Sequence, residues 1–104
     1  MPLKTRDLKR ALTGKFDFAP ADSRGQDHEW FQLRLEGYPA IFTKVSHGMR
    51  EVTDSLLPKI ANQLMVPRSF LLGMVECSQS REDYFARVRT NPTGPKAERF
   101  RRQN

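Results

Sequence analysis

The sequence predicts an α+β fold in which a three-stranded antiparallel sheet carries its helices on one face, with short helices added near the C-terminus. Phe31, Leu33 and Leu35 alternate with polar residues, which is typical of a half-buried strand. Residues 40–45 form a second β-prone run. Apolar residues at helical spacing stand before and after these runs, so the expected element order is α-β-β-β-α.

The first helix is expected to begin near Thr5 and to end at Gly14, because threonine caps helix N-termini and glycine commonly follows the last helical residue. Its buried stripe would consist of three apolar residues at helical spacing: Leu8, Ala11 and Leu12. A short first strand over residues 15–19 should follow, because Phe16 and Phe18 alternate with a polar residue.

A turn at residues 36–37 is expected to join the second and third strands. If the alternating apolar residues face a core, the residues between them share the open face of the sheet: His28, Trp30, Gln32 and Arg34. In an antiparallel pair the start of one strand lies beside the end of the next. We therefore expect His28 and His47, the two histidines of the chain, to be close in space.

Pro58 determines where the next helix begins, because proline is tolerated in the first turn of a helix and not deep inside it. That helix should start at residue 54 or 55. Its expected buried positions are Leu56, Leu57, Ile60, Ala61 and Leu64. Pro67 should open a second short helix, and Ser80, with an aspartate three residues later, should cap a third.

Three segments are expected along the chain. Residues 1–66 would form the α-β-β-β-α unit, residues 67–90 a helical extension packed on it, and residues 91–104 a basic flexible tail. The tail begins where the run Asn-Pro-Thr-Gly-Pro at residues 91–95 breaks any helix.

The formal net charge of +6 is concentrated toward the C-terminus, where six basic residues stand against one acidic residue from Tyr84 onward. A basic tail can bind phosphate backbones without sequence preference, and we assign this role to Arg99, Arg101 and Arg102. The alternative is a tail that only keeps the chain in solution.

Several protein classes are not expected. No run approaches the ~20 apolar residues that span a bilayer, and the N-terminus lacks the apolar stretch of a secretory signal. Cys77 is the only cysteine, so we expect a cytoplasmic protein without an intrachain disulfide or a Cys-rich zinc site, and an inert, buried thiol.

His28 and His47 with Asp27 are an alternative metal site, but they lack local ligand spacing, so we expect no metal and no cofactor. The oligomeric state stays open.

His28 is the candidate acid–base group, because imidazole exchanges protons near neutral pH. In RNA hydrolysis it would remove the 2′-OH proton or protonate the leaving 5′-oxygen, while Lys44, Arg34 and His47 act on the phosphate. Trp30 would stack on an unpaired base. The alternatives are a histidine that merely hydrogen-bonds to the acids beside it, and a tryptophan that covers the sheet against the tail or a second copy of the chain.

Residues 25–30 read Gly-Gln-Asp-His-Glu-Trp, residues 44–48 read Lys-Val-Ser-His-Gly, and a Leu-Leu-x-x-Ile-x-x-x-Leu helix follows. This pattern, over about residues 4–66, resembles the HicA (YcfA-like) toxin family, whose fold is similar to a double-stranded-RNA-binding domain. The family motif is Gly-Ser-His-His before an aromatic residue. Here Gln26 and Asp27 stand in place of its serine and first histidine.

The resemblance implies a metal-independent ribonuclease that cuts messenger RNA, with His28 in the catalytic position and a HicB-like antitoxin as partner. Three hypotheses therefore remain open. The protein is an RNA-directed enzyme of HicA type, a non-catalytic module that binds RNA or a protein partner, or a regulatory protein that pairs its sheet with another chain.

Overall fold

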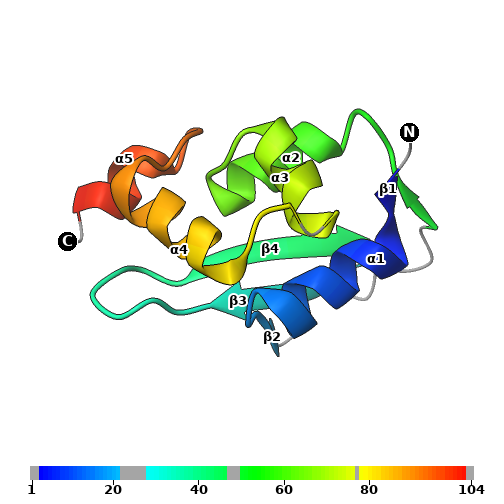
Figure 1. Cartoon of the computed structure of the whole chain (residues 1–104), viewed down its shortest axis with the longest axis horizontal. Helices are drawn as coiled ribbons and strands as arrows, with labels where there is room; N and C mark the ends of the chain where they lie inside the picture. The colour runs from blue at the N-terminus through cyan, green and yellow to red at the C-terminus, as the bar shows by residue number, and fades with distance from the viewer. Residues whose placement is uncertain (1–2, 22–27, 47–49, 77, 103–104) are drawn as a thin grey trace.

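The computed structural model describes residues 3–21, 28–46, 50–76 and 78–102, and only the backbone of His28, Ser46 and Arg102 (Figure 1). A π-helical segment, Ala11–Lys15, continues the first helix directly. The elements follow in the order β1 (Leu3–Lys4), α1 (Thr5–Arg10), β2 (Ala19–Ala21), β3 (His28–Leu33), β4 (Ile41–Ser46), β5 (Glu51–Val52), α2 (Leu57–Leu64), α3 (Arg68–Val75), α4 (Arg81–Thr90) and α5 (Ala97–Arg102). None of the helices in these ranges is both long and apolar enough to cross a membrane.

The main sheet is three-stranded and antiparallel, in the order β2-β3-β4, which confirms the predicted α+β class and the central hairpin. Leu33 pairs with Ile41, and the ladder runs on to His28, which pairs with Ser46. The beginning of β3 therefore lies beside the end of β4, as the hairpin predicts.

The first strand was placed wrongly by the sequence pattern: β2 covers Ala19–Ala21 rather than residues 15–19. The helical backbone continues to Lys15, and the N–H groups of Phe16 and Phe18 donate to Ala11 and Leu12 carbonyl oxygens at 3.1 and 2.9 Å. These bonds hold the two phenylalanines against the helix. Both are buried, so their alternation reflects a turn packed into the core and not a strand.

A second, two-stranded sheet joins β1 to β5 and was not predicted. Leu3 pairs with Val52, and the Thr5 N–H donates to the Arg50 carbonyl oxygen at 2.9 Å. Thr5 is consequently a buried residue inside α1, and Lys4 holds the capping position that we had assigned to Thr5.

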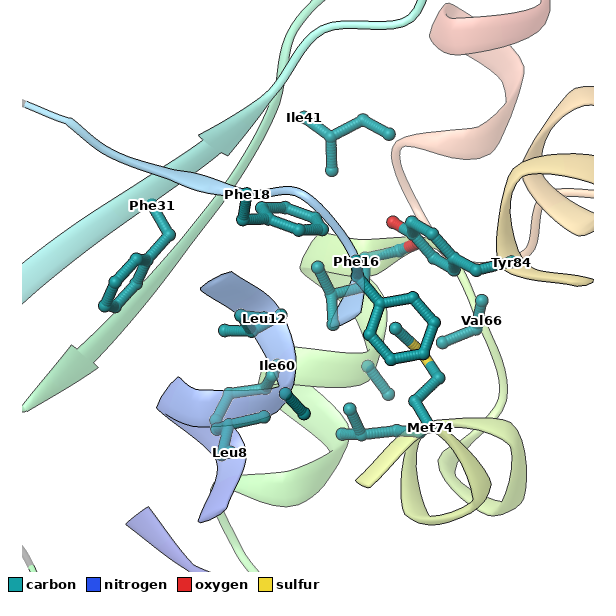
Figure 2. Close-up of a cluster of buried hydrophobic side chains, with 14 of the residues drawn as sticks. Leu8, Leu12, Phe16, Phe18, Phe31, Ile41, Ile60, Val66, Met74 and Tyr84 are labelled. Atoms are coloured by element: carbon teal, nitrogen blue, oxygen red, sulfur yellow. The ribbon is translucent and has the colours of Figure 1, made fainter. Parts of the chain in front are cut away.

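Helices cover one face of the main sheet. On the other, which we call the open face, Phe42 and Lys44 are exposed in the part of the chain that the structure describes. Phe31 and Leu33 of β3 are buried, as are Ile41 and Val45 of β4. Figure 2 shows how side chains from the first helix, α2, α3 and α4 meet this face, and Tyr84 projects into their centre. The covered face is the hydrophobic core of the domain.

The C-terminal helices follow the predicted order, with one shifted start. α2 begins at Leu57 and not at residue 54 or 55, because Thr53 first forms a separate turn by accepting the Leu56 N–H at 3.0 Å. α3 starts directly after Pro67, as predicted. The capping box of α4 is confirmed, since the Ser80 hydroxyl accepts the Asp83 N–H while the Asp83 carboxylate accepts the Ser80 N–H.

The flexible tail predicted for residues 91–104 is wrong for its described part. The Pro- and Gly-containing segment ends α4 as expected, but the Thr93 N–H then donates to the Met65 carbonyl oxygen at 2.9 Å and α5 follows. Ala97 and Phe100 of α5 are buried, and the Phe100 ring stacks on Tyr38 with 4.7 Å between centroids. Ala97 and Phe100 are three positions apart, so they lie on the same side of α5.

Candidate nucleic-acid interface

The open face of the sheet combines aromatic and basic side chains at its centre. Trp30 of β3 pairs with Lys44 of β4, and the Lys44 ammonium group lies 5.6 Å from the centroid of the Trp30 ring. Trp30 is half-buried and Lys44 is exposed. Phe42 lies two residues from Lys44 in the same strand and is 40% exposed, the largest exposure of a large hydrophobic residue in the described part of the chain. We call Trp30, Phe42 and Lys44 the aromatic-basic patch.

Strand register keeps this patch on the open face. Thr43 and Val45 are buried on the covered face, so Phe42 and Lys44 between them must face the other way. A shift of the pairing by one residue would bury Lys44 and expose Val45, which is energetically unfavourable in both respects. The apolar residues of the core therefore determine where the patch lies.

Gln63 of α2 braces β4 from its outer edge. Its Oε1 atom accepts the Thr43 hydroxyl at 2.6 Å and the main-chain N–H of Lys44 at 3.2 Å. This contact holds the strand that carries Lys44 against the helix layer. The sequence analysis did not identify Gln63. The only sign of its role in the sequence is that a polar residue stands beside the apolar stripe of α2.

The acidic residue after His28 is turned away from the open face. Glu29 pairs with Val45 across the strands, on the covered side, and its carboxylate forms an ion pair with Lys9 of α1 at 2.6 Å. Glu29 is adjacent to Trp30 in sequence, but its negative charge lies on the covered side of the sheet, where Lys9 neutralises it.

The structure describes the side chains of some predicted site residues and not of others. Arg34 is exposed directly after β3, while Arg99 and Arg101 are exposed on α5. The backbone position of His28 begins β3, in the same strand as Trp30. The side chains of His28 and Arg102, and the whole of His47, lie outside the described residues, as does Cys77.

A groove of about 430 Å³ lies where the start of β4 meets the end of α2 and α5. Phe42, Met65 and Phe100 supply apolar surface, and Lys96 and Arg99 are its basic residues. The structure thus brings Arg99, which we had assigned to a mobile tail, to the edge of the sheet beside Phe42. Burial of Phe100 holds it there.

Two further features bear on chemistry. Within the described ranges, no three histidine, cysteine, aspartate or glutamate side chains gather as ligands of a metal ion would. Tyr84 is fully buried, and its burial raises the pKa of the phenol far above its ordinary value. Its hydroxyl donates to the Leu64 carbonyl oxygen at 3.1 Å, so this tyrosine belongs to the core and not to a site.

Comparison of the chain with protein-family models, with curated proteins and with solved structures finds no match.

Proposed function

We propose that this protein binds single-stranded RNA on the open face of its sheet, with a HicA-like, double-stranded-RNA-binding-domain-like arrangement of its elements. The observation that carries the proposal is the aromatic-basic patch, in which a lysine lies over a tryptophan on the uncovered face. Unpaired bases stack on aromatic rings, and lysine binds the phosphates between them. The lone cysteine of the sequence favours a cytoplasmic location, where RNA is available.

The geometry of the patch suits two successive bases. Trp30 pairs with Lys44, and Phe42 stands two residues before Lys44 in β4, opposite Gln32, so the two aromatic residues are diagonal neighbours. Such neighbours are roughly 7–8 Å apart, within reach of large side chains. One base would stack on each ring, and the Lys44 ammonium group would move from over the Trp30 ring to the connecting phosphate.

Arg34 extends the positive charge of the patch beyond the end of β3. Arg101 of α5 is also exposed, and the net charge of the chain is +6. This charge favours a polyanion over a neutral ligand and predicts affinity that falls with added salt.

Fluorescence anisotropy with a labelled eight-nucleotide oligouridylate tests the proposal. Trp30→Ala should weaken binding roughly 5- to 150-fold, because stacking contributes about 1–3 kcal/mol per base. Lys44→Ala should weaken binding and reduce the slope of log affinity against log salt by about 0.7. Lys59→Ala is the matched control, because it removes one exposed lysine from α2 at equal cost in net charge. Equal affinities for the Lys44 and Lys59 variants, with no loss from Trp30→Ala, would refute RNA binding at the patch.

RNA cleavage is a second candidate function, favoured by the position of His28 at the start of the strand that carries Trp30. In this proposal the His28 imidazole takes the 2′-OH proton, and the 2′-oxygen attacks the adjacent phosphorus. The bond to the 5′-oxygen breaks, which leaves a cyclic phosphate and, once the oxygen is protonated, a 5′-hydroxyl. A HicB-like antitoxin would be the inhibitory partner that the resemblance implies.

Incubation of the wild type and of His28→Ala with a mixed single-stranded RNA pool in excess EDTA tests cleavage. Cleavage by the wild type alone supports a metal-independent ribonuclease that depends on His28. Retention of RNA by both proteins without cleavage supports a binding module and removes the enzymatic proposal.

A further inference from the structure

We propose that the outer edge of β4 is a docking site for an extended acidic segment of a protein partner, which pairs with the main chain of Phe42 as an added strand. The proposal uses the strand edge and the groove beside α5. It shares Phe42 with the RNA surface proposed above, but it uses the main chain of that residue and not the face of its ring.

The direction of the Phe42 main chain follows from the contact at Lys44. β4 is the last strand in the sheet order β2-β3-β4, and its Lys44 N–H donates to Gln63 of α2, from which we infer that this N–H points away from β3. In an antiparallel ladder, positions that face the partner strand alternate with positions that face away. Phe42, two residues from Lys44, therefore also directs its N–H and C=O outward.

Pro20 supports the same alternation from the opposite side of β3. It pairs with Phe31, and Phe31 pairs with Thr43 of β4. If the N–H and C=O of Phe31 bond to Thr43, Phe31 forms no main-chain hydrogen bond with β2. The missing N–H of Pro20, which stands opposite Phe31, then costs nothing. The two ladders are thus consistent with outward-facing groups at Phe42.

Along the outer edge of β4, the main chain is accessible for pairing at Phe42 but not at Lys44. Gln63 occupies the Lys44 N–H, which limits the length of strand that can add there. In the described part of the chain, no turn, cap or side-chain hydrogen bond engages the Phe42 main chain. The other sheet edge, β2, is only Ala19–Ala21 and contains Pro20, so it is unsuited to strand addition.

The groove beside this edge selects the chemistry of the segment. Met65 and Phe100 supply apolar surface for a side chain, Lys96 and Arg99 supply positive charge, and no aspartate or glutamate among the described residues lines the groove. A strand that adds to a sheet edge gains affinity from main-chain bonds and specificity from side-chain pockets. Charge complementarity requires an acidic segment, and it disfavours a second copy of this chain, which carries the same +6 charge.

The test is a ¹⁵N-NMR titration of the full chain with three end-blocked eight-residue probes. The first alternates glutamate and valine, the second has the same sequence with N-methylated backbone amides, and the third alternates lysine and valine. The first probe should shift the Phe42 amide resonance and slow its hydrogen exchange. Lys96→Glu combined with Arg99→Glu should weaken this probe at least about fivefold and strengthen the lysine probe. These substitutions change exposed side chains, so the fold should persist.

Several outcomes would overturn the proposal. These are no saturable change at Phe42 with up to about 1 mM of the acidic probe, equal binding of the N-methylated probe, or equal binding of the acidic and lysine probes. Protection of the Phe42 amide by an oligouridylate but not by the acidic probe would assign the groove to RNA. Protection that depends on protein concentration alone would assign the edge to a second copy.

Discussion

Tyr84 provides a sharp test of the packing because its hydroxyl and its ring have separable roles. The side chain is fully buried, its hydroxyl donates to the Leu64 carbonyl oxygen at 3.1 Å, and its ring meets Phe16 edge-on with 5.8 Å between centroids. Tyr84→Phe keeps the ring and removes only the hydroxyl. It should lower the free energy of unfolding at pH 7 by about 1 kcal/mol, because one buried hydrogen bond is lost.

The same substitution should change the response of stability to alkaline pH. Burial raises the pKa of Tyr84 in the folded state, whereas tyrosine in the unfolded chain titrates near pH 10. The folded state then keeps a proton that the unfolded state releases, so this contribution to stability is complete below about pH 10 and is lost as pH rises above it. At pH 11 the wild type should have lost about 1.4 kcal/mol that Tyr84→Phe does not lose. The two stability curves should therefore cross between about pH 10 and 11.

Urea denaturation of both proteins at pH 7, 9, 10 and 11 measures the effect. Trp30, the only tryptophan of the chain, serves as the fluorescent probe. Tyr38→Phe is the matched control, because it removes the other tyrosine, which is only half-buried. Parallel curves for the wild type and Tyr84→Phe between pH 9 and 11 would show that Tyr84 is not buried as described.

Three other substitutions test separate contacts. Ser80→Ala should lower the free energy of unfolding in urea by about 1 kcal/mol, because it removes the cap of α4; an unchanged midpoint would refute this. Phe100→Ala should release α5 and speed amide hydrogen exchange there, because the ring that anchors the helix is buried; exchange at the wild-type rate would contradict the docking of α5. Gln63→Ala should cost about 1–3 kcal/mol in urea denaturation, because Thr43 and Lys44 lose their shared acceptor. Gln63→Glu keeps an acceptor and should cost less.

The α+β class, the β3–β4 hairpin and the helix signals at Pro67 and Ser80 were all predictable from sequence. Each depends on short-range rules, namely the period-two alternation of Phe31 and Leu33, the limits on proline in a helix, and the capping chemistry of serine. Such signals lie within a few residues of one another, so no knowledge of distant segments is needed. They also place Trp30 on the open face, with His28, Gln32 and Arg34.

Tertiary packing decided what local patterns could not. Phe16 and Phe18 alternate like a strand, but long-range burial against Tyr84 and a helical backbone override that pattern. The brace from Gln63 to β4, the pairing of β1 with β5 and the docking of Phe100 on Tyr38 each join residues far apart in sequence. Their contact energy depends on which surfaces the folded chain brings together, and no local residue pattern carries that information.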